Sequence, residues 1–114
     1  MVQAQGDPWI GIDLGTTNSC VGWWNHGRPD IIQNDSGMNT TPSVVSYEAD
    51  DKKVIGIAAL NKASRNAQNT VYDAKRMIGR KFSDQKIQED KNLWPFAVVN
   101  GGNDRIQIQL KDGK

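Results

Sequence analysis

A strand, a glycine-threonine turn and a second strand lie near the start of this chain and constrain its fold most. Residues 10–21 read IGIDLGTTNSCV, with a large apolar side chain at every second position of the first segment: Ile10, Ile12 and Leu14. Alternate residues of a strand share a face, so the opposite face carries Gly11, Asp13 and Gly15. The pattern predicts strands over 9–14 and 19–24 that pair as a hairpin.

The glycine-rich face has the chemistry of a phosphate site. Its lack of bulk lets a ligand approach the backbone, and the Asp13 carboxylate could hold a metal ion or its water shell. The turn adds backbone N–H groups, two hydroxyls and an amide from Thr16, Thr17 and Asn18, which suit a bound polyphosphate. The alternative is an ordinary hairpin whose turn happens to be Gly-Thr-Thr, since hairpin turns commonly need glycine.

The string GIDLGTTNSCVG resembles the first phosphate-binding hairpin of the heat shock protein 70 family of chaperones, which belongs to the actin/hexokinase-like ATPases. Further segments resemble the family in its own order and spacing: residues 31–35, 40–43, 69–76, 78–82 and 94–96. A short glycine-rich motif alone is weak evidence. The collinear series, which covers nearly all of the chain from about Trp9 onward, is strong evidence.

Length and composition narrow the class of protein further. The chain has 114 residues, a net charge of +1 and one cysteine. The length predicts one small domain, and a single cysteine cannot form an internal disulfide. The near-zero net charge predicts no strong electrostatic attraction to nucleic acid or anionic lipid. The sequence has no apolar run long enough for a transmembrane helix. We therefore expect a soluble, cytoplasmic or nuclear protein.

The resemblance implies an α/β fold, the partial start of an actin-like (ribonuclease-H-like) ATPase lobe. It divides the chain into a tail at 1–8, incomplete first strands with the phosphate loop at 9–40, and a small α+β capping subdomain at 41–114. Family members are several times longer, with a two-lobed ATPase domain and a peptide-binding domain. We therefore expect a fragment without activity of its own, which self-associates because its first strands lack partners.

The resemblance also implies the site and its ligands. Asp13 is expected near Mg²⁺, mainly through water, and Gly15, Thr16, Thr17 and Asn18 at the β- and γ-phosphates of ATP or ADP. In the intact parent, ATP binding and hydrolysis would drive peptide binding and release. Its expected partners are unfolded peptides, co-chaperones and nucleotide-exchange factors, with neither nucleic acid nor membrane among them.

One position departs from the family pattern. Without a gap, the resemblance sets the family's catalytic lysine on Leu60, so no catalytic residue is assigned. Leucine carries no charge and donates no hydrogen bond, and losing such a group costs about 3–5 kcal/mol of transition-state stabilisation. This favours, as an alternative, a non-catalytic nucleotide-sensing or interaction module (a pseudo-ATPase). A free-standing β-rich binding domain with chance similarity is a third hypothesis.

The remaining elements follow from periodicity and capping. We expect strands over 29–33, 44–47, 53–55, 96–99 and 106–110, and a helix within 56–65. Thr70 is expected to cap a short helix ending near 78, and Ser83 a weak helix ending near 90. Cys20 is interpreted as a buried thiol and His26 as an exposed turn residue. Four basic residues at and just after the end of the short helix near 78 are interpreted as a solvated cluster: Lys75, Arg76, Arg80 and Lys81.

Overall fold

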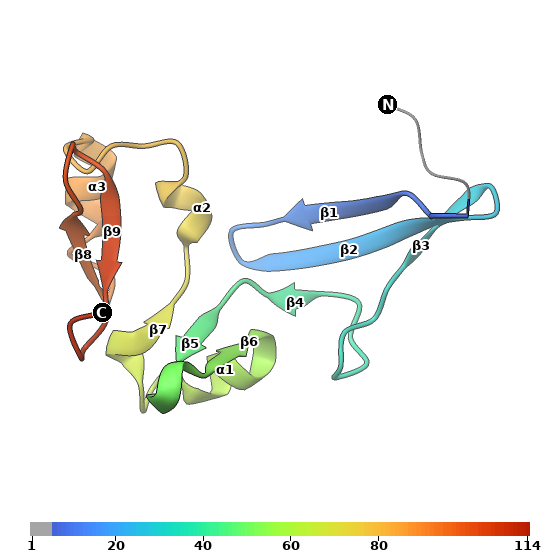
Figure 1. Ribbon diagram of the computed structural model, residues 1–114, viewed down its shortest axis with the longest axis horizontal. Helices are drawn as coiled ribbons and strands as arrows, with labels where there is room; N and C mark the ends of the chain where they lie inside the picture. The colour runs from blue at the N-terminus through green and yellow to red at the C-terminus, as the bar shows by residue number, and fades with distance from the viewer. Residues whose placement is uncertain (1–5) are drawn as a thin grey trace.

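The computed structural model describes residues 6–114, so part of the predicted tail, residues 1–5, lies outside the described residues (Figure 1). The strands are β1 (Ile10–Leu14), β2 (Asn18–Asn25), β3 (Arg28–Ile31), β4 (Thr41–Pro42), β5 (Val45–Tyr47), β6 (Lys53–Ile55), β7 (Thr70–Val71), β8 (Ala97–Asn100) and β9 (Ile106–Gln109). The helices are α1 (Gly56–Lys62), α2 (Ala74–Met77) and α3 (Gln85–Asp90), with 3₁₀ turns at Ala49–Asp51 and Ala67–Asn69.

The predicted pairing of the first two strands as a hairpin is confirmed. β1 pairs antiparallel with β2 from Ile10 opposite Trp23 to Leu14 opposite Ser19. β3 continues the sheet on the other edge of β2, and β4 pairs with the start of β2 on that same edge. The first sheet therefore runs β1-β2-β3, with β4 joined to β2 beside the turn.

This hairpin extends from the rest of the molecule as an arm (Figure 1). The radius of gyration is 17.0 Å, whereas a compact domain of this length has roughly 13 Å. All five residues of β1 are exposed, and the buried apolar side chains lie between Val44 and Val98. The arm is thus held by backbone pairing and by its contact with β4 rather than by a core of its own.

The middle of the chain forms a second sheet, in the order β6-β5-β7, with α1 packed against it. Gly56 begins α1 at φ +66°, and a Cβ there would lie 2.8 Å from the Thr41 methyl group, so the position needs glycine. Behind the sheet, the fully buried hydroxyl of Ser46 accepts hydrogen bonds from Thr70 and from the Asn66 amide. This buried polar cluster joins β5 to β7.

The main hydrophobic core lies between α2, α3 and the β8–β9 hairpin. Its buried members are Met77, Ile87, Trp94, Phe96 and Val98. The rings of Trp94 and Phe96 stack with centroids 5.6 Å apart, and Tyr72 meets Phe96 edge-on at 5.5 Å. These aromatic contacts tie the segment after β7 to the C-terminal hairpin.

The two predicted helix caps are wrong. Thr70 lies in β7 and donates to the Asn66 carbonyl, and α2 begins only after Asp73. Ser83 bonds the Asp104 carboxylate, whereas the side chain of Asp84 caps α3 by accepting from the Lys86 N–H. In each case a tertiary or neighbouring partner competes with the local capping geometry.

The fold class predicted from the sequence is confirmed: small antiparallel sheets and short helices form a mixed α/β arrangement consistent with part of an actin-like ATPase lobe. Cys20 is half-buried rather than fully buried, because β1 and β2 lack a covering layer, and His26 is exposed in its turn as expected. Among the described residues, no helix has the length and apolar character needed to span a membrane.

Candidate functional site

The turn between β1 and β2 requires glycine at its first position. A Cβ added to Gly15 would lie 2.1 Å from the carbonyl oxygen of Asn18, far inside contact distance. No other residue fits without opening the turn. The tight approach draws the backbone of 15–18 into a compact loop at the end of the arm, as the sequence predicted for a phosphate-binding turn.

Ser43, in the segment that follows β4, fixes the carbonyl groups of this turn. Its hydroxyl donates to the Gly15 carbonyl at 2.8 Å, and its N–H donates to the Thr17 carbonyl at 2.9 Å. The Ser19 and Ser43 hydroxyl oxygens lie 2.8 Å apart and are hydrogen-bonded to each other. Two acceptors of the turn are therefore occupied by one residue.

The donors of the turn remain available. Within residues 6–114, the N–H groups of Thr16 and Thr17 make no hydrogen bond to another protein group. A loop whose carbonyls are held and whose N–H groups are free is an anion-binding arrangement. The geometry therefore suits phosphate oxygens rather than a cation.

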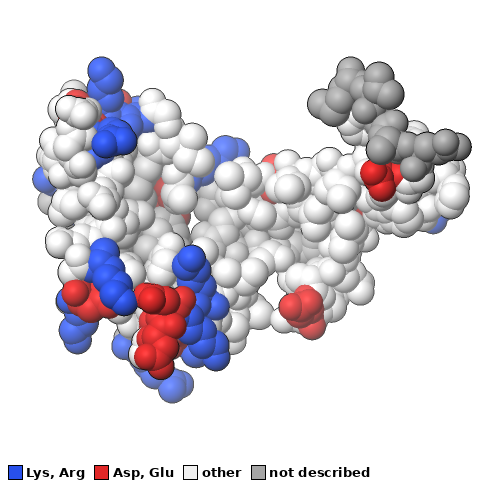
Figure 2. All heavy atoms as spheres, viewed as in Figure 1, with Lys and Arg blue, Asp and Glu red and all other residues white. Residues whose placement is uncertain are grey.

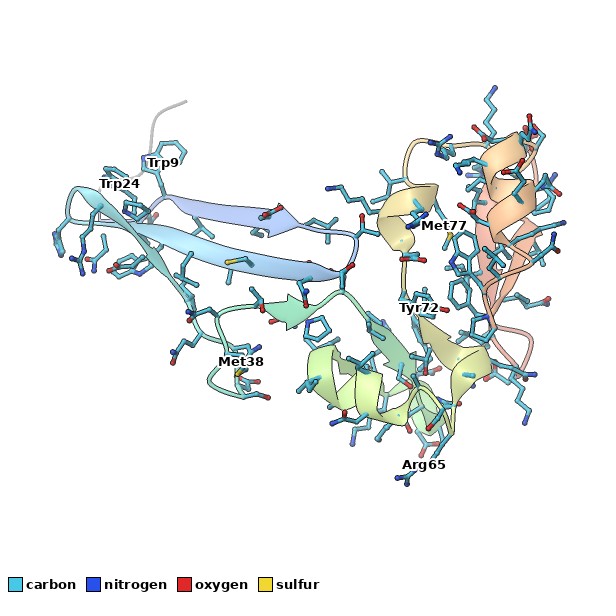
Figure 3. All side chains as sticks on the ribbon, turned by 180° about the vertical axis from the view of Figure 1, so that it is seen from behind. Trp9, Trp24, Met38, Arg65, Tyr72 and Met77 are labelled. Atoms are coloured by element: carbon cyan, nitrogen blue, oxygen red, sulfur yellow. The ribbon has the colours of Figure 1, made fainter. Side chains whose placement is uncertain are left out.

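A cleft of about 490 Å³ opens beside the turn. Its polar lining residues are Thr16, Thr17, Asn18, Ser43 and Asp73, and its mainly apolar lining residues are Pro42, Val44, Leu60, Ala63 and Tyr72. Tyr72 lies between the end of the arm and the C-terminal unit (Figure 3). The cleft thus joins the turn at 16–18 to lining residues that lie between positions 42 and 73 in the chain. A local sequence pattern does not predict that these segments meet.

Asp73 connects the cleft to the core. It adopts a left-handed conformation at φ +58°, and its carboxylate accepts a hydrogen bond from the Trp94 indole N–H at 3.0 Å. Arg76 lies 3.7 Å from the same carboxylate. Because its charge is paired and hydrogen-bonded, Asp73 acts as a fixed wall of the cleft.

Asp13 lies apart from the cleft lining. It is exposed on the face opposite Ile12, paired in register with Cys20, and it has no ion-pair partner among the described residues. The described residues also contain no group of three carboxylate, imidazole or thiol side chains that could enclose a metal. A single free carboxylate fits Mg²⁺ held mostly by water and phosphate oxygens, and it does not fit a closed protein cage.

Leu60 lines the cleft, whereas Lys75 is not among its lining residues. Leu60 belongs to the mainly apolar part of this lining and is half exposed. Lys75 stands on α2, two residues after the cleft residue Asp73, and is exposed without an ion pair in the part of the chain described. Figure 1 shows α2 facing the turn end of the β1–β2 hairpin. Lys75 is therefore an exposed cation on the helix that faces this end of the hairpin.

Sequence reasoning does not assign two residues of the turn and cleft, Ser43 and Asp73. Ser43 follows a Thr-Thr-Pro segment, and Asp73 lies in segment 69–76. Both segments resemble the family, and this resemblance is the signal that could have found them, although neither segment carries a glycine-rich motif.

Comparison with known proteins gives consistent matches. The family model described as Hsp70 protein matches residues 9–114. The chain is 53% identical over 105 residues to heat shock cognate 70 kDa protein 3 of Dictyostelium discoideum, covering 90% of this chain and 16% of that protein. It is 44% identical over 105 residues to the chaperone protein DnaK of Carsonella ruddii, covering 92% of this chain and 17% of that protein.

A human relative, putative heat shock 70 kDa protein 7, is 48% identical over 108 residues, which cover 94% of this chain and 29% of that protein. The chain therefore spans about one sixth of the length of the Dictyostelium and Carsonella proteins that it matches. The similarity accounts for this chain almost completely and for those relatives only in part.

Proposed function

This chain belongs to the Hsp70 family, and from that premise we propose that it forms the first part of the ATP-binding domain of a molecular chaperone. The observation that carries the proposal is the tethered turn. Ser43 holds the carbonyls of Gly15 and Thr17, and this leaves the N–H groups of Thr16 and Thr17 free for phosphate oxygens.

The phosphate ligand fits the remaining residues of the cleft. In our proposal the N–H groups and hydroxyls of Thr16 and Thr17, with the N–H of Asn18, bind the β- and γ-phosphates of ATP or ADP. Asp13 holds water molecules of a bound Mg²⁺, which would neutralise phosphate charge. The two functions lie on neighbouring parts of one hairpin, so a single backbone geometry sets both.

Lys75 supplies the positive charge in this proposal. Its ammonium group has no ion-pair partner within residues 6–114, and α2 faces the phosphate turn. Phosphoryl transfer depends on positioning and on cations that stabilise charge as it develops. A cation from α2 removes the need for a lysine at position 60.

The alternative, a non-catalytic nucleotide-sensing module, has no support in the comparisons, in which the reported relatives carry chaperone and heat-shock names. It depended on Leu60 standing where a catalytic lysine is required. In the structure Leu60 is one of the lining residues of the cleft. We therefore favour an ATPase parent.

The larger function is part of the same proposal. ATP binding and hydrolysis in the intact parent would switch peptide affinity, with unfolded peptides, co-chaperones and nucleotide-exchange factors as partners in the cytoplasm. The chain itself supplies one phosphate turn and the small subdomain from 41 onward. Because it spans about one sixth of the Dictyostelium relative, we expect the isolated chain to bind ATP weakly and not to hydrolyse it.

A chimera tests the proposal. Residues 9–114, which match the family model, replace the corresponding segment of the Dictyostelium relative, to which the chain is 53% identical over 105 residues. We expect the chimera to bind ATP and to hydrolyse it in a single turnover, because this segment retains the phosphate turn and Lys75. A correctly folded chimera that binds no nucleotide would refute the proposed role of the turn.

A further inference from the structure

The one-turn helix α2 is attached to the C-terminal core at both of its ends. Its last residue, Met77, is buried in the cluster that also contains Trp94 and Phe96. Asp73, the residue directly before the helix, accepts a hydrogen bond from the Trp94 indole N–H at 3.0 Å. A helix this short is not stable by itself, because its few backbone hydrogen bonds do not offset the cost of starting it. These two attachments therefore determine how α2 lies.

The carboxylate of Asp73 serves the core and not its own helix. An aspartate directly before a helix usually accepts from N–H groups of the first turn. Within residues 6–114 the Asp73 side chain makes no such capping bond, and its backbone is left-handed at φ +58°, which few residue types adopt. Its carboxylate contacts the Trp94 indole and lies 3.7 Å from the Arg76 side chain. The indole contact thus stabilises a backbone turn that local capping does not.

Trp94 offers its N–H from a fixed place. Its ring is 8% exposed and stacks on Phe96 at an interplanar angle of 13°. A buried indole N–H needs an acceptor, because leaving it without one costs free energy. The ring stacking and the need for an acceptor together hold Asp73 in one position against the core.

Lys75 lies on the side of α2 opposite to the core. Successive residues of an α-helix are about 100° apart, so Lys75 is rotated by about 200° from Met77. Met77 is buried in the core, whereas Lys75 is exposed. Figure 1 shows α2 between the C-terminal unit and the turn end of the β1–β2 hairpin, and Asp73 shares the cleft lining with that turn. The helix face that carries Lys75 is therefore turned from the core, on the side of the hairpin.

We propose that Trp94 is a positioning residue: by holding Asp73 it sets the rotation of α2, and with it the direction in which Lys75 leaves the helix. This inference rests on the proposed function, in which Lys75 supplies positive charge during phosphoryl transfer. The cleft lining includes Asp73 but not Trp94, so Trp94 acts through Asp73. Because the lysine charge acts mainly on the transition state, loss of the indole donor lowers the hydrolysis rate more than the ATP affinity.

Trp94→Phe in the chimera is the first test, because it keeps a ring to stack on Phe96 and removes the N–H donor. We expect the single-turnover hydrolysis rate to fall by about tenfold and the ATP dissociation constant to change by less than about threefold. Val98→Ala is the matched control, since Val98 is equally buried in the same core. It should lower the melting temperature and leave the rate per folded molecule unchanged. An unchanged rate in Trp94→Phe, or an equal loss in Val98→Ala, would overturn the proposal.

Substitutions at position 73 test the same bond without a Trp94 variant, so they decide the question if Trp94→Phe fails to fold. Asparagine tolerates the left-handed conformation and keeps an oxygen that can accept from the indole, whereas alanine has no acceptor. We expect the Asp73→Asn chimera to hydrolyse ATP at least about fivefold faster than Asp73→Ala. Equal rates in the two variants would overturn the proposal.

A double-mutant cycle separates the hydrogen bond from the backbone preference of position 73. If the bond to the indole is the cause, the advantage of asparagine over alanine should disappear in the Trp94→Phe background. If the left-handed backbone alone is the cause, the advantage should persist without the indole N–H. A persistent advantage would therefore overturn the positioning role of Trp94.

Amide hydrogen exchange in the 114-residue chain tests the positioning without nucleotide. The Arg76 N–H donates to the Asp73 carbonyl at 2.9 Å in the single turn of α2. Trp94→Phe should accelerate exchange at Arg76 relative to the amides of β5 and β6, and Val98→Ala should not. Equal relative exchange at Arg76 in the wild type and Trp94→Phe would overturn the proposal.

The two kinds of measurement distinguish failure of this inference from failure of the proposed function. A wild-type chimera that hydrolyses no ATP, or a Lys75→Met chimera as fast as the wild type, would refute the proposed function. The exchange result would still decide whether Trp94 holds α2. An active chimera that needs Lys75, combined with a Trp94→Phe rate equal to that of the wild type, would overturn the positioning role alone.

Discussion

The hydroxyl of Ser43 donates to the carbonyl of Gly15 across 2.8 Å, and the Ser43 N–H holds the Thr17 carbonyl. This relationship joins two segments that lie 28 residues apart and that the sequence alone does not connect. It ties two carbonyl groups of the glycine-threonine turn to the segment that follows β4. The proposed nucleotide site therefore depends on both segments.

Removal of the Ser43 hydroxyl should loosen the turn. In the 114-residue chain, we expect Ser43→Ala to cost about 1 kcal/mol in the local stability of the turn. Amide hydrogen exchange at residues 19, 20 and 43 should accelerate, while exchange at β8 and β9 stays unchanged. Ser64→Ala is the control, because Ser64 is exposed and makes no hydrogen bond within the described residues. Unchanged exchange in Ser43→Ala would contradict the tethering role.

Glycine at position 15 should be essential for nucleotide binding. In the chimera we expect Gly15→Ala to lower ATP affinity by at least tenfold, because its Cβ would meet the Asn18 carbonyl at 2.1 Å and open the turn. Gly11→Ala is the matched control on the same strand, since nothing lies within 4 Å of a Cβ there. Isothermal titration calorimetry checks both. Equal affinity losses in the two variants would show that the turn geometry is not the cause.

Lys75, rather than position 60, should control hydrolysis. In the chimera we expect Lys75→Met to lower the single-turnover rate by about 10²–10³-fold, with a much smaller change in ATP affinity, because the charge acts on the transition state. Lys81→Met is the control, an exposed cation further along the chain. Leu60→Lys should change the rate little. A large rate increase in Leu60→Lys would instead revive the non-catalytic alternative.

The unit from β5 to β9 should carry most of the folding free energy. Phe96 is 2% exposed and contacts the rings of Trp94 and Tyr72. We expect Phe96→Ala to destabilise the chain by about 3–5 kcal/mol, measured by urea unfolding. Leu93→Ala should stay within about 0.5 kcal/mol, because Leu93 is 78% exposed. Similar decreases in the free energy of unfolding for Phe96→Ala and Leu93→Ala would show that Phe96 does not lie in the main core.

Strands with clear alternation were predicted well from sequence. The pairing of residues 10–14 with 19–23 follows from the apolar alternation and the glycine-threonine turn, and the strand at 106–109 follows from Ile106 and Ile108 alternating with glutamines. Such patterns are local, so neighbouring residues decide them. The two-residue strands β4 and β7 carry no period and were not expected.

Only the part of the candidate site that lies within the β1–β2 hairpin was predictable from the sequence. The glycine, threonine and carboxylate residues of the hairpin could be named, because one segment contains them. The contribution of Ser43 and the position of Asp73 depend on contacts across 20 or more residues, to Gly15 and to Trp94. The assignment of Leu60 to the lysine position rests on an ungapped match, which compares residue types and not their placement around a cleft.

The most direct test of the central claim is a backbone amide NMR titration of the 114-residue chain with pyrophosphate and Mg²⁺. We predict progressive, millimolar-range shifts at the N–H groups of Thr16, Thr17 and Asn18, absent with adenosine and absent in Gly15→Ala. Shifts of equal size in wild type and Gly15→Ala, or none at these three amides, would contradict the claim that this turn binds phosphate.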